Sequence, residues 1–344
     1  MLVAELSNPH QFRLVDSPAV PDPAPGQIQV AVKAVGICGS DLHYFSDGGI
    51  GEARCVYPMV LGHEPAGVVR KTGPGVSGWS AGDRAVLEPA LYCYHCEFCM
   101  TGHHNVCANL RFLSQPEEPG FFRELVNLPA HNLLPLAAGV SDQEGALVEP
   151  LAVVVHSMQF AAPRPGETAV VFGAGPIGLL TIAMLKLSGV TRVWSVDPVA
   201  HRRDLARSVG ADAVIDPAAA DPAREILRET ANRGVDIAID CAGKSDSIDQ
   251  CLQAARHAGR VVVTGIPSED YVRLGLHILR RKELAFYSVR RSNHDSEAAL
   301  RLLAAHSRLF APILTHTRPL ADIQAAFVMC EQYADGVGKL TITL

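Results

Sequence analysis

The chain has 344 residues, 48% of them hydrophobic and 19% charged, which is the composition of a globular protein with room for about two domains. Its formal net charge of −6 and its lack of a basic run argue against nucleic acid as a partner. No apolar run reaches the ~18 residues of a membrane-spanning helix, and the N-terminus lacks the pattern of a secretory signal. We therefore expect a cytoplasmic protein with no membrane partner.

The first part of the sequence consists of short apolar runs separated by turns rich in glycine, proline and serine. Apolar and polar residues alternate over Ile28–Lys33, which predicts a half-buried strand, and Gly67–Val69 and Arg84–Leu87 predict further short strands. This pattern predicts a β-rich unit that forms a partly open barrel.

Cys38 and His63 are the first candidate metal ligands in the chain. A thiolate and an imidazole are ligands that Zn²⁺ takes, and Glu64, next to His63, adds a carboxylate. Ser40 and His43 lie between them and can pass a proton. A lone cysteine and a lone histidine are equally well explained as core residues, so this pair alone does not decide between a metal site and packing.

Glu149 shifts the balance toward a metal site. It lies in the apolar stretch Val148–Leu151, just before the predicted domain junction, and clefts between domains are common places for small-molecule sites. An isolated buried carboxylate is costly unless it is paired or bound to metal. The sequence therefore predicts a metal held by Cys38, His63 and an acidic residue, with Glu64 and Glu149 both candidates.

Four cysteines in a C-x2-C-x2-C-x7-C pattern form a second candidate metal site: Cys93, Cys96, Cys99 and Cys107. Four thiolates at this spacing suit a closed tetrahedral Zn²⁺ site, in which no position remains for a substrate. A disulfide pair and an iron–sulfur cluster are the alternatives, and the cytoplasmic expectation and the lack of ferredoxin spacing disfavour both. We expect a structural zinc that holds a loop-rich lobe together.

The second half of the sequence alternates strand and helix patterns. A helical pattern begins at about Val153, and apolar residues at Ile177, Leu180, Met184 and Leu187 predict a one-faced helix after the first strand. Six strands with helical crossovers predict a doubly wound parallel sheet. We expect these strands near residues 168–172, 192–196, 213–215, 235–240, 260–264 and 284–289.

The C-terminal tail returns to an amphipathic helix, predicted over 298–309, and to a short strand over 339–344. We expect this tail to rejoin the first domain, which makes that domain discontinuous. The predicted domains are therefore residues 1–155 with 298–344, which carry the catalytic metal, and residues 156–297, which form the parallel sheet.

A glycine-rich loop, G-x-G-x-x-G at Gly173, Gly175 and Gly178, follows a strand and opens a helix. The glycines make the turn, let the backbone approach a pyrophosphate and let the helix pack on the strand, while the helix N-terminus attracts the anion. Asp197 ends the next strand, where a carboxylate binds the adenosine ribose and repels a 2′-phosphate. This favours NAD over NADP, although Arg202 would tolerate a phosphate and Asp197 could also act as a helix N-cap.

Together these features resemble the zinc-dependent medium-chain alcohol dehydrogenase superfamily, in particular the sorbitol (polyol) dehydrogenases, with the L-idonate 5-dehydrogenases as near kin. The resemblance runs the whole chain and follows the family's order. It implies a GroES-like catalytic domain and a Rossmann NAD-binding domain, in a homodimer or homotetramer, with one catalytic and one structural zinc per chain. The segments that carry it are Gly36–Tyr44, Pro58–Glu64, the four-cysteine lobe, Glu149–Leu151, the Gly173 loop and Val289–Arg290.

The resemblance also implies roles for individual residues. Cys38 and His63 are zinc ligands, and Glu64 or Glu149 completes the set, directly or through water, with an exchange during turnover. Ser40 and His43 match proton-relay positions. The remaining matches are Tyr44, Phe112, Glu149 and Arg290 at the substrate, and Gly173, Gly175, Ile177, Gly178, Asp197, Arg202 and Val289 at the cofactor.

One departure from the polyol branch is Arg291, which stands where that branch often has an aromatic residue. A second guanidinium there would suit a substrate carboxylate, but equally a cofactor phosphate or solvent. We expect transfer of a hydride from a secondary alcohol of a polyol or sugar acid, such as sorbitol, xylitol or L-idonate, to NAD. The alternatives are an L-threonine dehydrogenase-like enzyme and a catalytically silent NAD-binding protein.

Overall fold

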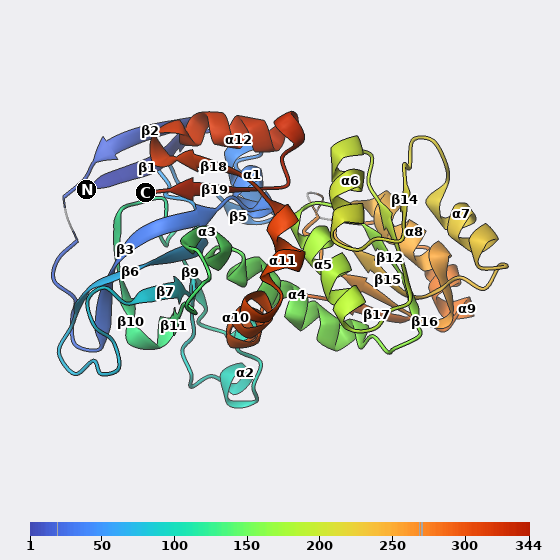
Figure 1. The fold of residues 1–344 in the computed structure, drawn as a ribbon, viewed down its shortest axis with the longest axis horizontal. Helices are drawn as coiled ribbons and strands as arrows, with labels where there is room; N and C mark the ends of the chain where they lie inside the picture. The colour runs from blue at the N-terminus through green and yellow to red at the C-terminus, as the bar shows by residue number, and fades with distance from the viewer. Residues whose placement is uncertain (19, 268, 270) are drawn as a thin grey trace. The chain divides into compact units, whose positions relative to one another are not determined.

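The computed structural model describes residues 1–18, 20–267, 269 and 271–344, and these form two compact units. The first unit comprises Met1–Glu149, Ser296–Ser307 and Leu314–Leu344, and the second comprises Pro150–Asp295 and Arg308–Ile313. Figure 1 shows the course of the chain through both. No helix among the described residues has the length and apolarity needed to cross a membrane.

The first unit is built on a mixed sheet of seven strands, counted over the described residues, in the order β11-β7-β6-β3-β19-β18, with β10 also paired to β3. Short outer strands and helices surround it. The sheet strands are β3 (Gln27–Gly36), β6 (Glu64–Thr72), β7 (Arg84–Leu87), β10 (Leu125–Pro129), β11 (Leu133–Pro135), β18 (Leu314–Pro319) and β19 (Lys339–Thr343). The other elements are β1 (Leu2–Asn8), β2 (Gln11–Asp16), α1 (Gly39–Ser46), β4 (Gly49–Ile50), β5 (Ala53–Arg54), α3 (Asp142–Gly145), α10 (Ser296–Ala305) and α12 (Ile323–Glu331).

Aromatic packing explains why the tail returns to the first unit. Phe327 of α12 is fully buried, with its ring centroid 5.2 Å from that of Phe45 in α1 and 5.8 Å from that of Phe122. Burying such a ring is worth roughly 1.5–3 kcal/mol, which favours docking of α12 on the first unit. The helix thereby covers β2, β18 and β19 (Figure 1).

Three neighbouring strands of this sheet bring distant parts of the chain together. Gly36 at the end of β3 pairs with Glu64 at the start of β6 and with Thr341 of β19. Both pairings are antiparallel, so the beginning of β6 and the beginning of β19 flank the same end of β3. That end leads directly into Cys38 and α1.

The second unit is a parallel sheet of six strands over the described residues, in the order β14-β13-β12-β15-β16-β17. The predicted doubly wound sheet is confirmed, and the order reverses direction between β12 and β15, where such folds bind ligands. Its strands are β12 (Thr168–Phe172), β13 (Arg192–Val196), β14 (Ala213–Ile215), β15 (Val235–Asp240), β16 (Ala255–Val263) and β17 (Ala285–Ser288). Its helices are α4 (Val148–Ala161, which begins in the first unit), α5 (Pro176–Leu187), α6 (Ala200–Ser208), α7 (Pro222–Glu229), α8 (Ser245–Ala254), α9 (Leu276–Arg281) and α11 (Ser307–Phe310).

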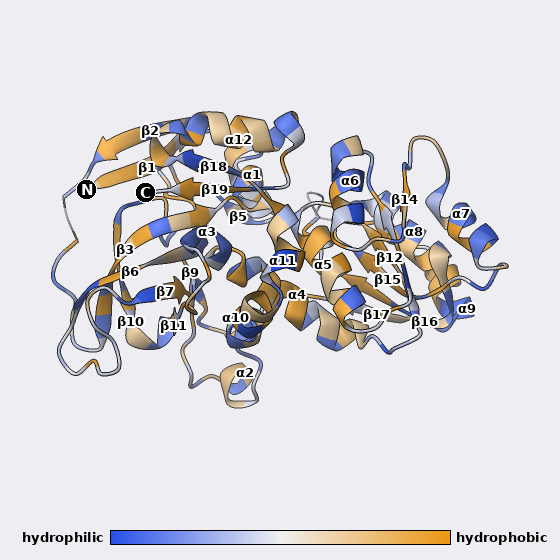
Figure 2. Cartoon of the chain, in the orientation of Figure 1, coloured by the Kyte–Doolittle hydropathy of each residue, from blue (hydrophilic) through white to orange (hydrophobic). Residues whose placement is uncertain are grey.

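Hydropathy separates the inner from the outer elements of this unit. Figure 2 shows β12, β15 and α5 in orange, whereas α6 and α7 carry blue. Every residue of β15 is buried, as expected for a central parallel strand, and α5 is buried from Gly178 to Leu185. A helix buried along so much of its length packs against the sheet on one side and against other elements on the other.

Two helices differ from their predicted bounds. The helical pattern expected from about Val153 begins at Val148, so Glu149 lies in a first helical turn. The single helix expected over 298–309 is two helices, α10 and α11. Because the helix breaks, Phe310 and Ile313 join the second unit, where both are fully buried. The free energy gained by burying these apolar side chains exceeds that of the helical hydrogen bonds lost at the break.

Candidate metal centres and cofactor loop

Cys38, His63 and Glu64 converge as the first candidate metal centre. One ligand atom from each lies within 4.8 Å of the other two. Cys38 precedes α1, His63 ends the loop before β6, and Glu64 is the first residue of that strand. Both His63 and Glu64 are buried, with exposed fractions of 6% and 1%, respectively. Sulfur, imidazole nitrogen and carboxylate oxygen are the donors of catalytic zinc sites with three protein ligands, so these residues fit a zinc ion.

Asp41 supports this centre and was missed by the sequence analysis. Its carboxylate is fully buried and lies 3.3 Å from His63 Nδ1. It also accepts hydrogen bonds from the Ser114 hydroxyl at 3.0 Å and from the backbone N–H groups of Cys38 and Gly62 at 3.1 and 3.3 Å. A carboxylate on one ring nitrogen of a metal-binding histidine fixes the tautomer and leaves the other nitrogen for the metal.

The contact between Asp41 and His63 shifts the pKa of both groups. Burial raises the pKa of Asp41, but His63 and the backbone donors outweigh burial, so the net shift is downward. Burial lowers the pKa of His63, but the negative charges of Asp41 and Cys38 outweigh it, so the net shift is upward. The site thus concentrates negative charge around one imidazole, which favours a cation.

Replacing Asp41 with Asn is expected to weaken zinc binding at this centre by about 10–100-fold, because the amide neither carries the charge nor fixes the imidazole as well. Competition with a chromophoric chelator measures this affinity directly. Asp16→Asn is the matched control. It makes the same change of charge in the same unit, at a side chain that is 93% exposed. An unchanged zinc affinity in Asp41→Asn would show that this carboxylate is only a packing residue.

Helix α1 presents the predicted proton-relay residues. Ser40 Oγ lies 3.5 Å from His63 Nε2, and His43 Nδ1 lies 2.8 Å from Asp47 Oδ2. The His43 side chain is 26% exposed, so it reaches solvent while Ser40 faces the metal ligands. This arrangement is compatible with a relay from the metal centre to water.

The predicted substrate residues divide between the units. Phe112 is buried, with its ring centroid 5.6 Å from that of His63, and Tyr44 is buried in α1. Glu149 is buried in the first turn of α4, and the group of converging ligand atoms contains Glu64 rather than Glu149. Arg290 belongs to the second unit, where it follows Val289, whose N–H donates to the Val263 carbonyl at 2.9 Å.

Lys339 is a second residue that the sequence analysis missed. It is 1% exposed, forms an ion pair with Glu64 Oε2, and donates a hydrogen bond to the carbonyl of Ile37 at 2.8 Å. Burial lowers the pKa of Lys339, but the negative charges of Glu64 and Cys38 outweigh burial and the net shift is upward. Lys339 therefore places a full positive charge beside a candidate zinc ligand.

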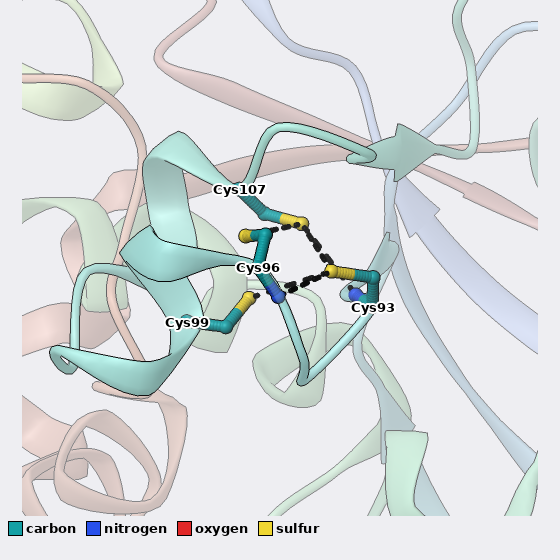
Figure 3. A group of neighbouring side chains, drawn as sticks. All are labelled: Cys93, Cys96, Cys99 and Cys107. Carbon is teal, nitrogen blue, oxygen red and sulfur yellow. Dashed lines mark hydrogen bonds between the residues drawn. The ribbon is translucent and has the colours of Figure 1, made fainter.

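The four cysteines of the second candidate metal centre converge as predicted (Figure 3). Their ligand atoms all lie within 4.8 Å of one another, with Sγ–Sγ distances of 3.5 Å for Cys107 to Cys93, 3.9 Å for Cys96 to Cys107 and 4.0 Å for Cys93 to Cys99. None of these described cysteines is in a disulfide. The lobe around them has little regular structure: β8 (Ala90–Leu91), α2 (Glu97–Met100), a 3₁₀ turn (His104–Val106) and β9 (Arg111–Phe112).

Backbone donors prepare two of these sulfurs to act as thiolates. A hydrogen bond from the His95 backbone lowers the pKa of Cys93 to about 5, and one from the Cys99 backbone lowers the pKa of Cys96. Burial instead raises the pKa of Cys99 to about 12, so this sulfur needs a cation beside it to ionise at neutral pH. Thiolates are the ligands of zinc, and the set fits a closed tetrahedral site.

The cofactor loop has the geometry that the glycine pattern predicts. Gly173 follows β12 with φ +92°, and Gly175 immediately precedes α5. A Cβ on Gly178 would collide with the Gly173 carbonyl, so the helix packs this close to the strand only with glycine there. Ile177 lies in the first turn of α5 beside these glycines. The loop and the N-terminus of α5 therefore offer backbone N–H groups to a phosphate.

Asp197 has a structural role beyond the predicted one. It is buried after β13, and its Oδ2 accepts a hydrogen bond from the Ala174 N–H at 2.7 Å while Oδ1 accepts one from the Val199 N–H at 2.8 Å. These bonds tie the glycine loop to the end of the next strand. Arg202 in α6 is beside the loop. Its Nη1 atom is 3.9 Å from the position that a Cβ on Gly175 would occupy.

Known proteins that are similar to this chain include zinc-binding dehydrogenases, which agrees with the two candidate metal centres and the cofactor loop. Residues 24–138 match the family "Alcohol dehydrogenase GroES-like domain", and residues 176–305 match "Zinc-binding dehydrogenase". The chain is 36% identical over 324 residues to the probable D-xylulose reductase A of Neosartorya fischeri, covering 92% of this chain and 90% of that protein. It is 32% identical over 342 residues to the sorbitol dehydrogenase of Bacillus subtilis, covering 99% and 97%.

Among solved structures, the chain is similar to a zinc-binding dehydrogenase of Sinorhizobium meliloti 1021 with NADP bound. The TM-score is 0.91 at 28% identity, and the match covers 100% of this chain and 99% of that one. The predicted fold class, zinc cofactor and nicotinamide dinucleotide cofactor are thus confirmed. This chain belongs to the zinc-dependent medium-chain alcohol dehydrogenase family and is an oxidoreductase.

Proposed function

We propose that this enzyme oxidises a secondary hydroxyl of a polyol, or of the related sugar acid, and passes the hydride to NAD. The observation that carries this proposal is the convergence of Cys38, His63 and Glu64, an acidic rather than an all-sulfur ligand set, in the first unit. A more polar metal environment suits a substrate with many hydroxyls better than a long apolar alcohol. The similarity to a D-xylulose reductase and to a sorbitol dehydrogenase supports the same substrate class.

In this proposal Cys38, His63 and one of Glu64 and Glu149 hold the catalytic zinc, and Asp41 keeps the imidazole oriented. The zinc, when bound, supplies a Lewis acid that lowers the pKa of a substrate hydroxyl. Ser40 accepts the hydroxyl proton as it gives up its own, and His43 passes the released proton to solvent. Tyr44 and Phe112 line the substrate position, and Arg290 contacts a distal hydroxyl or a carboxylate of the substrate.

The second unit binds the dinucleotide through Gly173, Gly175, Ile177, Gly178 and Val289, with the pyrophosphate at the N-terminus of α5. Asp197 accepts hydrogen bonds from the adenosine ribose, while Arg202 lies alongside. The protein's contribution to hydride transfer is to hold the reacting carbon and the nicotinamide ring at near-attack distance and to exclude water.

Asp197 sets the cofactor preference in this account. NAD is expected to have at least about tenfold higher kcat/KM than NADP, because the carboxylate repels a 2′-phosphate. Asp197→Asn keeps an oxygen acceptor but removes the charge. The ratio of kcat/KM for NAD to kcat/KM for NADP should therefore fall by about tenfold. Asp204→Asn in α6 is the matched control, since that side chain is 74% exposed. Preference of the wild-type enzyme for NADP, which the Sinorhizobium relative binds, would contradict the assignment.

A substrate panel tests the substrate class. Initial rates of NADH formation with sorbitol, xylitol, L-idonate, L-threonine and ethanol should rank a polyol or the sugar acid first. L-idonate ahead of sorbitol would support a contact of Arg290 or Arg291 with a substrate carboxylate, since guanidinium groups pair with carboxylates. Threonine or ethanol ranked first would reject the substrate class, and no turnover with any would favour a silent NAD-binding protein.

We also propose a homodimer or homotetramer. Strand β17 is the edge of the parallel sheet and presents Tyr287 at 37% exposure, so its unpaired backbone groups are available to a second copy. Light scattering coupled to size-exclusion chromatography measures the mass, and a monomer would contradict this proposal. The cytoplasmic location stays a prediction.

A further inference from the structure

Arg203 of α6 joins the ends of two neighbouring strands in the second unit. Its Nη1 donates hydrogen bonds to the carbonyl oxygens of Asp197 and Pro198, both at 2.8 Å. Its Nη2 forms an ion pair with Asp216 Oδ2 at 3.0 Å. Asp197 and Pro198 follow β13 and Asp216 follows β14, so one guanidinium group holds the chain after both strands.

The place of this contact bears on the cofactor. β13 and β14 are parallel neighbours, with Val196 paired to Ile215, and the Asp197 N–H donates to the Ile215 carbonyl at 3.2 Å. Ligands of such sheets bind outside the carboxyl ends of the strands. Arg203 therefore fixes the main chain of Asp197, the residue proposed above to bind the adenosine ribose.

The side chain of Asp197 is oriented by other contacts than its main chain. Its Oδ2 accepts a hydrogen bond from the Ala174 N–H and its Oδ1 accepts one from the Val199 N–H. A carboxylate oxygen has two lone pairs, so each oxygen keeps a position for a ribose hydroxyl. The direction in which these positions face depends on the main chain that carries the carboxylate, and Arg203 holds that main chain.

The guanidinium group of Arg203 is committed to the protein. Nη1 carries two N–H groups and makes two hydrogen bonds to main-chain oxygens, while Nη2 faces a carboxylate. The side chain is only 17% exposed. An arginine that selects NADP turns the N–H groups of its fork toward the 2′-phosphate instead. In Arg203 those groups are occupied by oxygens of the protein itself.

We propose that Arg203 is a positioning residue for cofactor choice. It holds the chain at Asp197 and Pro198 against Asp216, so that the Asp197 carboxylate faces the adenosine ribose and excludes a 2′-phosphate. Arg203 does not itself contact the cofactor. It therefore favours NAD over NADP, which is the opposite of the effect expected from its charge. This inference rests on the proposed function, because it takes Asp197 as the residue that binds the ribose.

Removing the guanidinium group tests the proposal. Arg203→Met keeps a good helix former in α6 and removes all three contacts. It should raise the Kd of NADH by about tenfold, because the Asp197 carboxylate loses its fixed direction toward the ribose. The Kd of NADPH should stay within about threefold, because weaker repulsion of the 2′-phosphate offsets the lost ribose contact. In turnover, KM for NAD should rise more than kcat falls.

Arg207→Met is the matched control. Arg207 is also in α6, but its side chain is 58% exposed and is paired with Asp204. This variant makes the same change of charge and should keep the wild-type Kd values for both dinucleotides.

Two further variants distinguish a role through Asp197 from a general loss of structure. In an Asp197→Asn background, Arg203→Met should leave the ratio of the Kd of NADPH to that of NADH unchanged within about twofold, because the carboxylate that it positions is gone. Asp216→Asn removes the ion pair but keeps the guanidinium group, and should lower this ratio as Arg203→Met does. It keeps the test open if Arg203→Met does not fold.

The fluorescence of the bound reduced dinucleotides gives both Kd values without any substrate. A ratio that falls in Arg203→Met, but not in the Asp197→Asn background, supports the proposal. A ratio that stays unchanged would show a general structural role, and one that rises would assign Arg203 to the 2′-phosphate. Either result overturns the proposal and leaves the proposed polyol oxidation standing. Tighter binding of NADPH than of NADH by the wild-type protein would instead reject the NAD preference in the proposed function itself.

Discussion

Replacing His63 with Ala is expected to lower the zinc content from two ions per chain to one and to reduce kcat/KM for a polyol by about 10³-fold or more. The imidazole is one of the three protein ligands expected at the catalytic centre, and loss of a Lewis acid removes several kcal/mol of transition-state stabilisation. Elemental analysis gives the zinc content, and NADH absorbance gives the rate. The fold should persist, because the main core of the first unit does not depend on this ring.

His10→Ala is the control for that experiment, since His10 is also in the first unit but its side chain is 51% exposed. It should retain two zinc ions and the full rate. If His63→Ala kept both ions and turned over normally, the metal centre would have to lie elsewhere in the chain.

Replacing Cys96 with Ser is expected to remove the other zinc ion and to lower Tm by at least about 10 °C. Structural zinc supplies about 10–16 kcal/mol of apparent binding energy in small domains, and the lobe around the four cysteines has few regular elements to replace it. Calorimetry together with elemental analysis tests this. The zinc at Cys38 and His63 should be retained, because the two groups share no ligand.

Cys55→Ser provides the matched control, as Cys55 is a free, half-buried cysteine outside both groups. It should keep two zinc ions and nearly the wild-type Tm. Unchanged zinc stoichiometry in Cys96→Ser would mean that the four sulfurs do not hold a metal, whatever their spacing.

The second unit was predictable because its signals are local. Most of its strands contain a short run of β-branched and apolar residues, and β15 shows the continuous burial that a central parallel strand requires. The loop at Gly173 needs glycine for reasons visible in the sequence, since its spacing is set by one turn and one helix start. The strand positions therefore agree to within a few residues with the predicted ones.

The supporting residues of the zinc centre were not predictable in the same way. Asp41 stands in the first turn of α1, where an acidic residue is usually explained by helix capping. Only the fold shows that it is fully buried against His63. A carboxylate three residues after a candidate cysteine ligand was the available signal, and it is weak without the tertiary contact.

Lys339 was hidden by sequence distance. It lies 275 positions after Glu64, and the two meet only because β3 pairs with both β6 and β19 in a particular register. Register between distant strands depends on packing and on turn geometry, which spacing along the chain does not reveal. The same long-range pairing explains why Glu64 converges on Cys38 and His63, whereas the sequence left Glu64 and Glu149 as equal candidates.

The most direct test of the central claim is zinc removal and return, followed by sorbitol-dependent NADH formation in one preparation. The account predicts two zinc ions per chain, loss of activity when a chelator removes the ion at Cys38 and His63, and recovery when one equivalent of Zn²⁺ is added. A chain that keeps its full rate with only the four-cysteine ion bound, or that binds both ions without oxidising any polyol or sugar acid, would contradict it.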